Sequence, residues 1–90
     1  MPENLTARAI GGGRVDLAWT DTSTGEVGFR IQRCAGRTCT AFTSIAMTGA
    51  NATSFSDTGL VAGQYYRYRV RAEAPAGASA WSNRVRVRAR

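Results

Sequence analysis

Residues 60–72 read LVAGQYYRYRVRA, a segment that alternates between apolar and charged side chains over most of its length. One parity carries apolar residues and the other carries arginines, namely Tyr66, Tyr68, Val70 and Ala72 against Arg67, Arg69 and Arg71. Successive side chains of a β-strand point to opposite faces of its sheet. The segment therefore predicts a long strand with one face in a hydrophobic core and one face covered with guanidinium groups.

The same period of two residues recurs on both sides of this segment. It is carried by Val15, Leu17 and Trp19, by Phe29 and Ile31, and by Val85 and Val87. Clusters of glycine, proline, aspartate and asparagine separate these runs, as turns between strands require. The pattern predicts seven short strands, at roughly residues 4–10, 14–20, 28–34, 40–46, 53–56, 65–73 and 81–89. Strands at this spacing indicate an all-β fold, either an antiparallel sandwich or a barrel.

The whole chain, residues 1–90, is expected to form a single domain. Ninety residues supply one hydrophobic core, and a content of 43% hydrophobic and 20% charged residues is that of a chain that folds. No apolar run reaches the ~18 residues of a membrane helix, and the amino end lacks the pattern of a signal peptide. We therefore expect a monomer with no membrane span.

Cys34 and Cys39 enclose four residues at the predicted turn after the third strand. A loop of this length across a hairpin can meet disulfide geometry, which requires a Cα–Cα distance of ~4.4–6.8 Å. A disulfide at this position would imply that the protein is secreted. A zinc site would need four ligands, and the chain has no histidine and no further cysteine. A redox motif of the CxxC type has two intervening residues instead of four. Two free thiols in a cytosolic protein remain the alternative.

The residue types of catalysis are missing or scattered. Histidine and lysine are absent, so the serines and threonines have no ordinary base to activate them. The six carboxylates fall in a terminus, a strand and different loops, and Asp57 is expected to hydrogen-bond the backbone of its own turn. We therefore expect no enzyme activity, no catalytic residue, no metal site and no cofactor.

Several motifs along the chain resemble those of fibronectin type III domains. They are Val15-x-Leu17-x-Trp19, Gly28-Phe29-x-Ile31, Leu60-x-x-Gly63-x-x-Tyr66-x-Tyr68-x-Val70-x-Ala72 and Gly77-x-Ser79-x-x-Ser82-Asn83. The resemblance covers nearly the whole chain and implies a seven-stranded antiparallel immunoglobulin-like sandwich. It implies that Trp19 lies in the core, that Leu60 plugs the loop before the sixth strand, and that Tyr66 forms a tyrosine corner. The expected core comprises Trp19, Phe29, Ile31, Leu60, Tyr66, Tyr68, Val70, Val85 and Val87.

The segments Thr20 to Arg33 and Ser54 to Leu60 look like the versions of this domain that are appended to bacterial secreted hydrolases. This resemblance implies a non-catalytic accessory or spacer module of a larger secreted, bacterial protein, with the flanking domains of that protein as its partners. A spacer predicts termini at opposite ends of the sandwich, ~35–40 Å apart at ~3.3 Å per strand residue. No Arg-Gly-Asp occurs in the loop at residues 73–78, so integrin binding is not implied.

All twelve basic residues are arginines, and the net charge is +6. By the resemblance, the third, sixth and seventh strands share one sheet, so seven arginines of outward parity should lie on a single face. We call this the arginine face, and its members are Arg30, Arg67, Arg69, Arg71, Arg84, Arg86 and Arg88. Like charges opposite one another on neighbouring strands are destabilising, which calls for a compensating partner.

Two compensations are conceivable for the arginine face. Aromatic rings could interleave: Ala80-Trp81-Ser82 resembles the second half of the Trp-Ser-x-Trp-Ser motif of cytokine receptors, although the first tryptophan is replaced by Ala78. At most a fragment of that motif's ladder is therefore expected. The other compensation is an external polyanion, such as an acidic polysaccharide, an anionic cell-envelope polymer or nucleic acid. The alternative is a well-solvated face whose charge keeps the module in solution.

A carbohydrate-binding surface is the remaining hypothesis. The alternation leaves Trp81 and Tyr65, with Phe42 as a third ring, as aromatic residues outside the core that could contact a sugar. Packing at a strand edge is the competing role for Trp81 and Tyr65.

Overall fold

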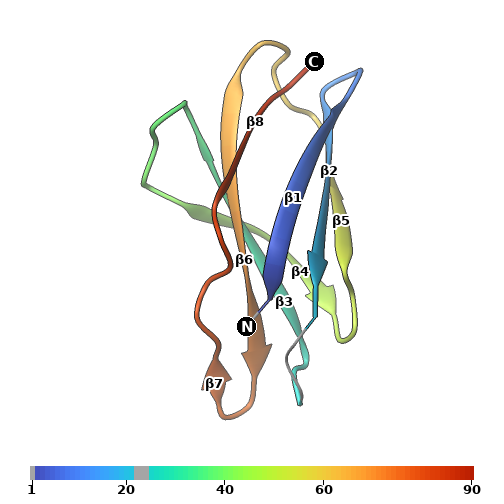
Figure 1. Ribbon diagram of the computed structural model, residues 1–90, viewed down its shortest axis with the longest axis vertical. Coiled ribbons are helices and arrows are strands. Elements are labelled where there is room, and N and C mark those ends of the chain that lie inside the picture. The colour runs from blue at the N-terminus through green and yellow to red at the C-terminus, as the bar shows by residue number, and fades with distance from the viewer. Residues whose placement is uncertain (1, 22–24) are drawn as a thin grey trace.

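The computed structural model describes residues 2–21 and 25–90, which form eight β-strands. The strands are β1 (Glu3–Ile10), β2 (Arg14–Thr20), β3 (Gly28–Ala35), β4 (Thr43–Gly49), β5 (Ser54–Asp57), β6 (Tyr65–Ala74), β7 (Gly77–Ala78) and β8 (Val85–Arg88). They build an elongated body of 39 × 23 × 19 Å (Figure 1).

Two antiparallel sheets face each other. The first has the order β1-β2-β5, and the second has the order β4-β3-β6, with β7 and β8 both paired to β6. This is the expected all-β sandwich. Because β3, β6 and β8 are neighbours in the second sheet, the outward side chains of all three strands share one surface.

Two predicted strand boundaries were wrong. The fourth strand was expected at residues 40–46 but begins at Thr43, because residues 36–42 form an irregular loop whose first part is closed by the Cys34–Cys39 disulfide. The last strand was expected at 81–89, yet the chain makes the short β7 and then a separate β8. Between them, the backbone N–H groups of Ser79 and Ser82 donate to β6 carbonyls at 2.9 and 2.8 Å, and their hydroxyls accept from β6 N–H groups at 3.0 Å. Side-chain oxygens therefore take the acceptor role of the ladder there.

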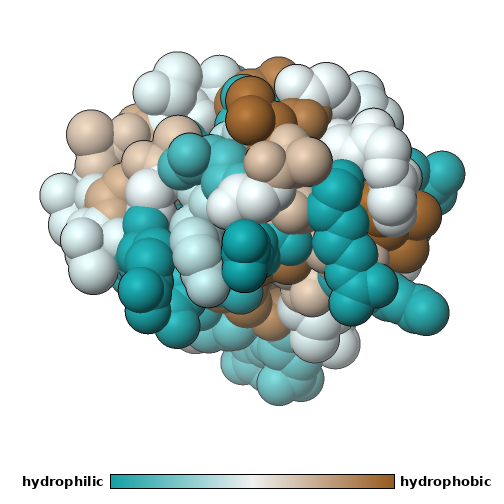
Figure 2. Space-filling view, turned by 90° about the horizontal axis from the view of Figure 1, so that it is seen from above, coloured by the Kyte–Doolittle hydropathy of each residue, from teal (hydrophilic) through white to brown (hydrophobic). Residues whose placement is uncertain are grey.

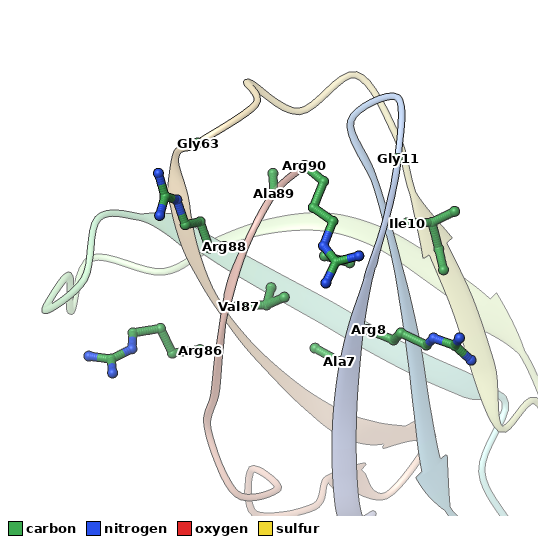
Figure 3. A pocket seen from close by; sticks show the side chains of 11 residues that line it. Ala7, Arg8, Ile10, Gly11, Gly63, Arg86, Val87, Arg88, Ala89 and Arg90 are labelled. Atoms are coloured by element: carbon green, nitrogen blue, oxygen red, sulfur yellow. The ribbon is translucent and has the colours of Figure 1, made fainter.

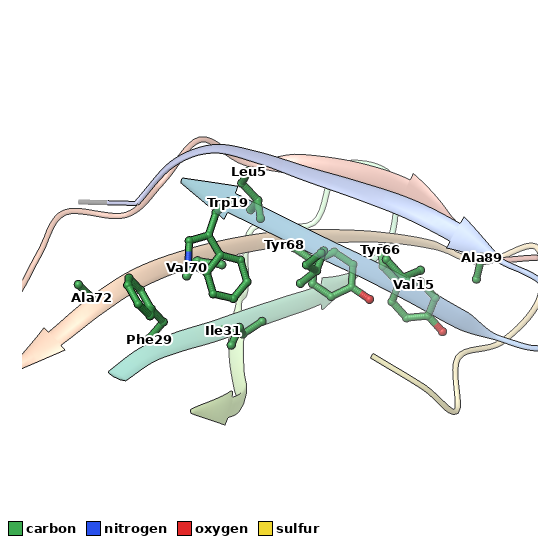
Figure 4. Close-up of a cluster of buried hydrophobic side chains, with 11 residues drawn as sticks. Leu5, Val15, Trp19, Phe29, Ile31, Tyr66, Tyr68, Val70, Ala72 and Ala89 are labelled. Atoms are coloured by element: carbon green, nitrogen blue, oxygen red, sulfur yellow. The ribbon is translucent and has the colours of Figure 1, made fainter. Parts of the chain in front are cut away.

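The core lies between the sheets and follows the predicted parity (Figure 4). Six of the nine expected core residues are buried, namely Trp19, Phe29, Ile31, Tyr66, Tyr68 and Val70. Leu60, Val85 and Val87 are only partly buried and pack against this cluster from its margin. The buried cluster also includes Leu5, Val15, Leu17, Ala72 and Ala89.

Tyr66 makes the contact of a tyrosine corner. Its hydroxyl oxygen accepts a hydrogen bond of 3.0 Å from the backbone N–H of Val61, five residues earlier. The ring is buried, so this bond satisfies the polar end of an otherwise apolar side chain. The loop before β6 is thereby fixed to the strand that follows it.

The start of β1 and the carboxyl end of the chain lie toward opposite ends of the long axis (Figure 1). The carbonyl oxygen of Arg90 accepts a hydrogen bond of 3.0 Å from Gly13, which places the carboxyl end beside the β1–β2 turn. Glu3 lies at the other end of β1, so the eight residues of this strand separate the ends by roughly 25–30 Å at ~3.3 Å per residue. This is less than the expected 35–40 Å because the β6–β7 hairpin extends past the start of β1 (Figure 1).

Candidate functional site

The arginine face forms on the second sheet as the parity predicts. In the strand registers, Arg30 lies opposite Arg71 and Arg67 lies opposite Arg86. The alternate residues of β6, from Tyr66 to Ala72, are buried, so its arginines point away from the core. Like charges are therefore placed directly across from each other, and the structure must compensate for them.

Rings and guanidinium groups alternate over one half of this face. The guanidinium carbons of Arg69 and Arg71 lie 4.2 and 4.4 Å from the centre of the Trp81 ring. Phe42 continues the row, because its ring centre lies 4.4 Å from Arg69 and 5.4 Å from Arg84. The fragment expected from Trp81 is thus extended by a ring from the segment that follows the disulfide.

Tyr65 makes a second set of cation–π contacts at the other end of β6. Its ring centre lies 5.1 Å from Arg37, 5.6 Å from Arg86 and 5.8 Å from Arg88. Trp81 and Tyr65 therefore contact different arginines. Each exposed contact of this type contributes roughly 0.5–1 kcal/mol.

Two polar side chains bind arginines of this face: Glu73 forms ion pairs, and Gln32 accepts a hydrogen bond. Arg30 and Arg71 both donate through Nε to the same oxygen of Glu73, at 2.8 and 2.9 Å. The hydrogen bond from Arg30 is the main reason that the pKa of Glu73 lies below its usual value. Arg69 donates through Nε to the Gln32 side-chain oxygen at 2.9 Å, and desolvation lowers the pKa of Arg69.

The remaining arginines of this region have no carboxylate partner within residues 2–21 and 25–90. Ion pairs in this part of the chain involve Arg14, Arg30, Arg33 and Arg71. Arg67 donates instead to the backbone carbonyl of Cys39. A pocket of about 380 Å³, which we call the basic pocket, is lined by Arg37, Thr38, Arg67, Arg84, Val85 and Arg86.

The disulfide closes the loop that forms one wall of the basic pocket. Cys34 and Cys39 are bonded at 2.01 Å with a Cα–Cα distance of 5.9 Å, inside the expected range. Gly36 has φ +120°, a conformation that other residues rarely adopt, and its N–H donates to the Tyr65 carbonyl at 2.8 Å. The loop is therefore fastened both to β3 and to the start of β6.

A polar cluster inside the sandwich corrects one expectation. The same oxygen of the Asp57 carboxylate accepts hydrogen bonds from the Tyr68 hydroxyl and from Arg33, both at 2.7 Å. The described hydrogen bonds of this carboxylate therefore join Asp57 to β6 and β3. The expected hydrogen bond to the backbone of its own turn is not among them. Burial, followed by the hydrogen bond to Asp57, raises the pKa of Tyr68.

A larger hollow of about 1050 Å³ lies between β1 and β8 (Figure 3). Small residues such as Ala7 and Ala89 line it, and Arg90 lies across it, while the side chains of Arg8 and Arg86 point away to either side. It is the opening between the edges of the two sheets. Seen from the end of the long axis, hydrophilic side chains stand out over much of the surface and apolar residues form separate patches (Figure 2).

Two further kinds of feature are absent from the described residues. Residues 2–21 and 25–90 contain no group of three or more histidine, cysteine, aspartate or glutamate side chains arranged to hold a metal ion. The same residues contain no helix of the length and apolarity needed to cross a membrane.

Comparisons with solved structures show the same fold in chains of low sequence identity. A Fn3-like protein from Clostridium thermocellum aligns with a TM-score of 0.81 and 23% identity, over 99% of this chain and 91% of that chain. The FN3 domain of human collagen XX aligns with a TM-score of 0.79 and 20% identity, over 97% of this chain and 88% of that chain. The twitchin kinase region from C. elegans aligns with a TM-score of 0.80 and 22% identity, over 96% of this chain and 16% of that chain.

Sequence comparisons give the family. No curated protein sequence matches the chain significantly. A family model described as the fibronectin type III domain, SaeA third domain, matches residues 4–90. Domains of this family are commonly modules of larger multidomain proteins and are generally non-catalytic. With the sandwich, the tyrosine corner and this match in agreement, the chain belongs to the fibronectin type III family.

Proposed function

We propose that this domain is a non-catalytic spacer in a larger secreted protein, where it holds its flanking domains at a fixed separation. The observation that carries the proposal is the path of the chain, which enters toward one end of the long axis and leaves at the other (Figure 1). Hydrogen bonds from Gly13 to Arg90 and from Gly63 to Ala89 fix the last residues to the body. A fixed exit makes the separation of the ends a property of the fold.

Secretion of the parent protein is supported by the disulfide between Cys34 and Cys39. Disulfides persist in oxidising compartments and are rare in the cytosol. A bacterial origin is supported by the resemblance of Thr20 to Arg33 and Ser54 to Leu60 to domains appended to bacterial hydrolases.

Pulsed electron paramagnetic resonance can test the spacer geometry on the single domain. Nitroxide labels attached through p-acetylphenylalanine at positions 3 and 90 leave the cysteines untouched, and we expect a narrow distance peak at roughly 25–30 Å. Labels at positions 11 and 90 serve as the control and should lie close together, since Gly11 is at the β1–β2 turn. A short main distance for the first pair, or a broad distribution, would contradict the proposal.

A second candidate function is binding of a polyanion on the arginine face. The specific observation is that the carboxylate pairing is uneven: Glu73 serves Arg30 and Arg71, whereas Arg84, Arg86 and Arg88 form none of the ion pairs of the described residues. Arginine suits sulfate and phosphate because its planar guanidinium makes bidentate hydrogen bonds. The rings of Trp81 and Phe42 are engaged by guanidinium groups, so the geometry favours an anionic ligand over a neutral sugar.

Heparin chromatography at physiological salt tests this second candidate. We expect retention of the wild-type domain, loss of retention in the Arg69→Glu, Arg86→Glu double variant, and weakened retention in Arg86→Glu alone. Arg8→Glu changes the net charge as much as Arg86→Glu but lies on β1, and it should elute closer to the wild type. Elution near 0.1 M salt with no effect of the double variant would leave the face as a solubility device. Retention on cellulose, chitin or xylan would instead favour the carbohydrate hypothesis.

A further inference from the structure

We propose that the basic pocket binds one tetrahedral oxyanion, a sulfate or phosphate group of a polymer, and that the Cys34–Cys39 disulfide holds the pocket in its binding form. The inference rests on the polyanion-binding candidate function and deepens it by assigning the subsite and its dependence on oxidation. The chemistry recognised is a compact group with several negatively charged oxygens, as carried by sulfate esters and by polyphosphate.

Positive charge converges on the pocket from three separate parts of the chain. Arg37 comes from the disulfide loop and Arg67 comes from β6. Arg86 belongs to β8, and Arg84 is the residue before that strand. No carboxylate of the described residues lines this pocket. Four like charges around one hollow repel each other, and an oxyanion placed among them would relieve that repulsion with charge-assisted hydrogen bonds.

Neighbouring groups hold these arginines in place before any ligand arrives. Arg67 donates to the Cys39 carbonyl and lies directly opposite Arg86 in the register of β6 and β8. The Phe42 ring lies 5.4 Å from Arg84, and the Tyr65 ring lies 5.1 Å from Arg37. Arginines that are already oriented lose less side-chain entropy when they bind an anion.

The disulfide fixes two of these elements at once. It anchors Cys39, whose carbonyl orients Arg67, and it closes the loop that presents Arg37 and Thr38 to the pocket. Reduction by a dithiol such as dithiothreitol would transfer two electrons and two protons to the S–S bond, which gives two thiols and the cyclic disulfide of the reductant. The loop would then be held by the hydrogen bond from Gly36 to Tyr65 but no longer by a covalent link.

Isothermal titration at physiological salt, with tripolyphosphate and with a heparin hexasaccharide as separate probes, tests the pocket. We expect Arg37→Ala to weaken binding roughly tenfold, the size of one charge-assisted contact. Arg8→Ala, which removes one charge on the other sheet, should change the affinity less than about twofold, since exposed charges at a distance are screened. Tighter binding of one probe assigns the oxyanion to phosphate or to sulfate. An equal loss of affinity in Arg37→Ala and Arg8→Ala would refute binding in the basic pocket.

The dependence on oxidation is tested with the Cys34→Ser, Cys39→Ser double variant and with the reduced wild type. Both should stay folded by circular dichroism and should bind as weakly as Arg37→Ala. Should the double variant fail to fold, insertion of two glycines between Arg37 and Thr38 loosens the loop with the disulfide intact and should weaken binding to the same extent. Full affinity in folded, disulfide-free protein would refute this part.

The outcomes also separate this inference from the broader candidate function. A wild-type domain that binds neither probe and elutes early from heparin would remove both. A domain that binds, loses affinity in Arg86→Glu and keeps it in Arg37→Ala would retain the arginine face as a binding surface and remove the pocket.

Discussion

Asp57 lies at the edge of the core and is 7% exposed. Its carboxylate accepts hydrogen bonds from two donors on other strands. Its position before Thr58 and Gly59 suggested a hydrogen bond within the turn, because aspartate side chains in turns can bond the backbone of their own turn. The sequence could not reveal the partners, because Arg33 and Tyr68 lie 24 and 11 residues away and meet Asp57 only once the sheets are packed. Long-range polar contacts of this kind leave no periodic signal.

Alkaline pH should destabilise the domain through Tyr68. Its pKa is raised above the usual value of about 10 by burial, so the folded state favours the protonated hydroxyl. The stabilisation is fully present below about pH 10 and is lost as the pH rises further, because the unfolded chain releases its proton first. Urea unfolding at pH 8 to 11 measures this loss. Tyr68→Phe should make the loss of stability at high pH smaller. Tyr65→Phe, which also removes one hydroxyl, is the control and should lose stability as the wild type does. Equal pH dependence in the wild type and both variants would refute the assignment to Tyr68.

Reduction of the disulfide should lower the free energy of unfolding by about 2 kcal/mol, the loop-entropy contribution of so short a ring. The domain should nevertheless stay folded, because its core lies elsewhere, between the two sheets. Thermal unfolding with and without reductant, monitored by circular dichroism, measures the difference. A domain that unfolds at 25 °C on reduction would show that the loop contributes far more than its entropy.

At the scale of the elements, parity predicted the inward and outward residues of β6 and β8, since a strand has only two faces. Together with the shared sheet that the family resemblance implies, parity also predicted that the seven arginines lie on one surface. It left Phe42 only as a ring outside the core and did not place it between Arg69 and Arg84, because this ring lies in an irregular loop where no period applies. Glu73 was missed although it has the same outward parity as Arg71, and its position two residues along the strand is the signal that could have indicated an ion pair.

Phe42→Leu should weaken the packing of the arginine face while keeping most of the apolar volume. Leucine offers no π face to Arg69 and Arg84, so we expect a loss of about 1–2 kcal/mol in the free energy of unfolding. Added salt should recover part of the loss by screening the exposed arginines from one another. Chemical denaturation at low and high salt measures both effects. Phe42→Tyr, which keeps a ring, is the control; equal stability of the leucine and tyrosine variants would argue against the contacts.

At the scale of the molecule, the sandwich was predictable because its core obeys a simple period, whereas its margins were not. Val85 and Val87 have the inward parity and Leu60 lies in the loop before β6, yet all three are only partly buried and pack against the cluster from its margin. The separation of the ends was overestimated for a related reason, because strand lengths alone do not say how far one hairpin is shifted along another.

The cost of a core substitution in the free energy of unfolding should be larger at the centre of the core than at its margin. Val70→Ala removes two methyl groups from a side chain with 0% exposure and should cost on the order of 2–4 kcal/mol in the free energy of unfolding. Leu60→Ala should cost less, although more atoms are removed, because its side chain is only partly buried. Thermal melts of the two variants measure the order. A larger loss for Leu60→Ala would mean that this residue seals the core more tightly than its exposure indicates.

The spacer proposal is tested most directly by small-angle X-ray scattering of three copies of the domain joined end to end. One copy has a radius of gyration of 12.6 Å. If each copy adds roughly 25–30 Å along a line, three copies should give a radius of gyration of about 26 Å. A compact chain of the same total length would give about 18 Å. A measured value near 26 Å is the result that a spacer predicts, and a value near 18 Å would contradict it.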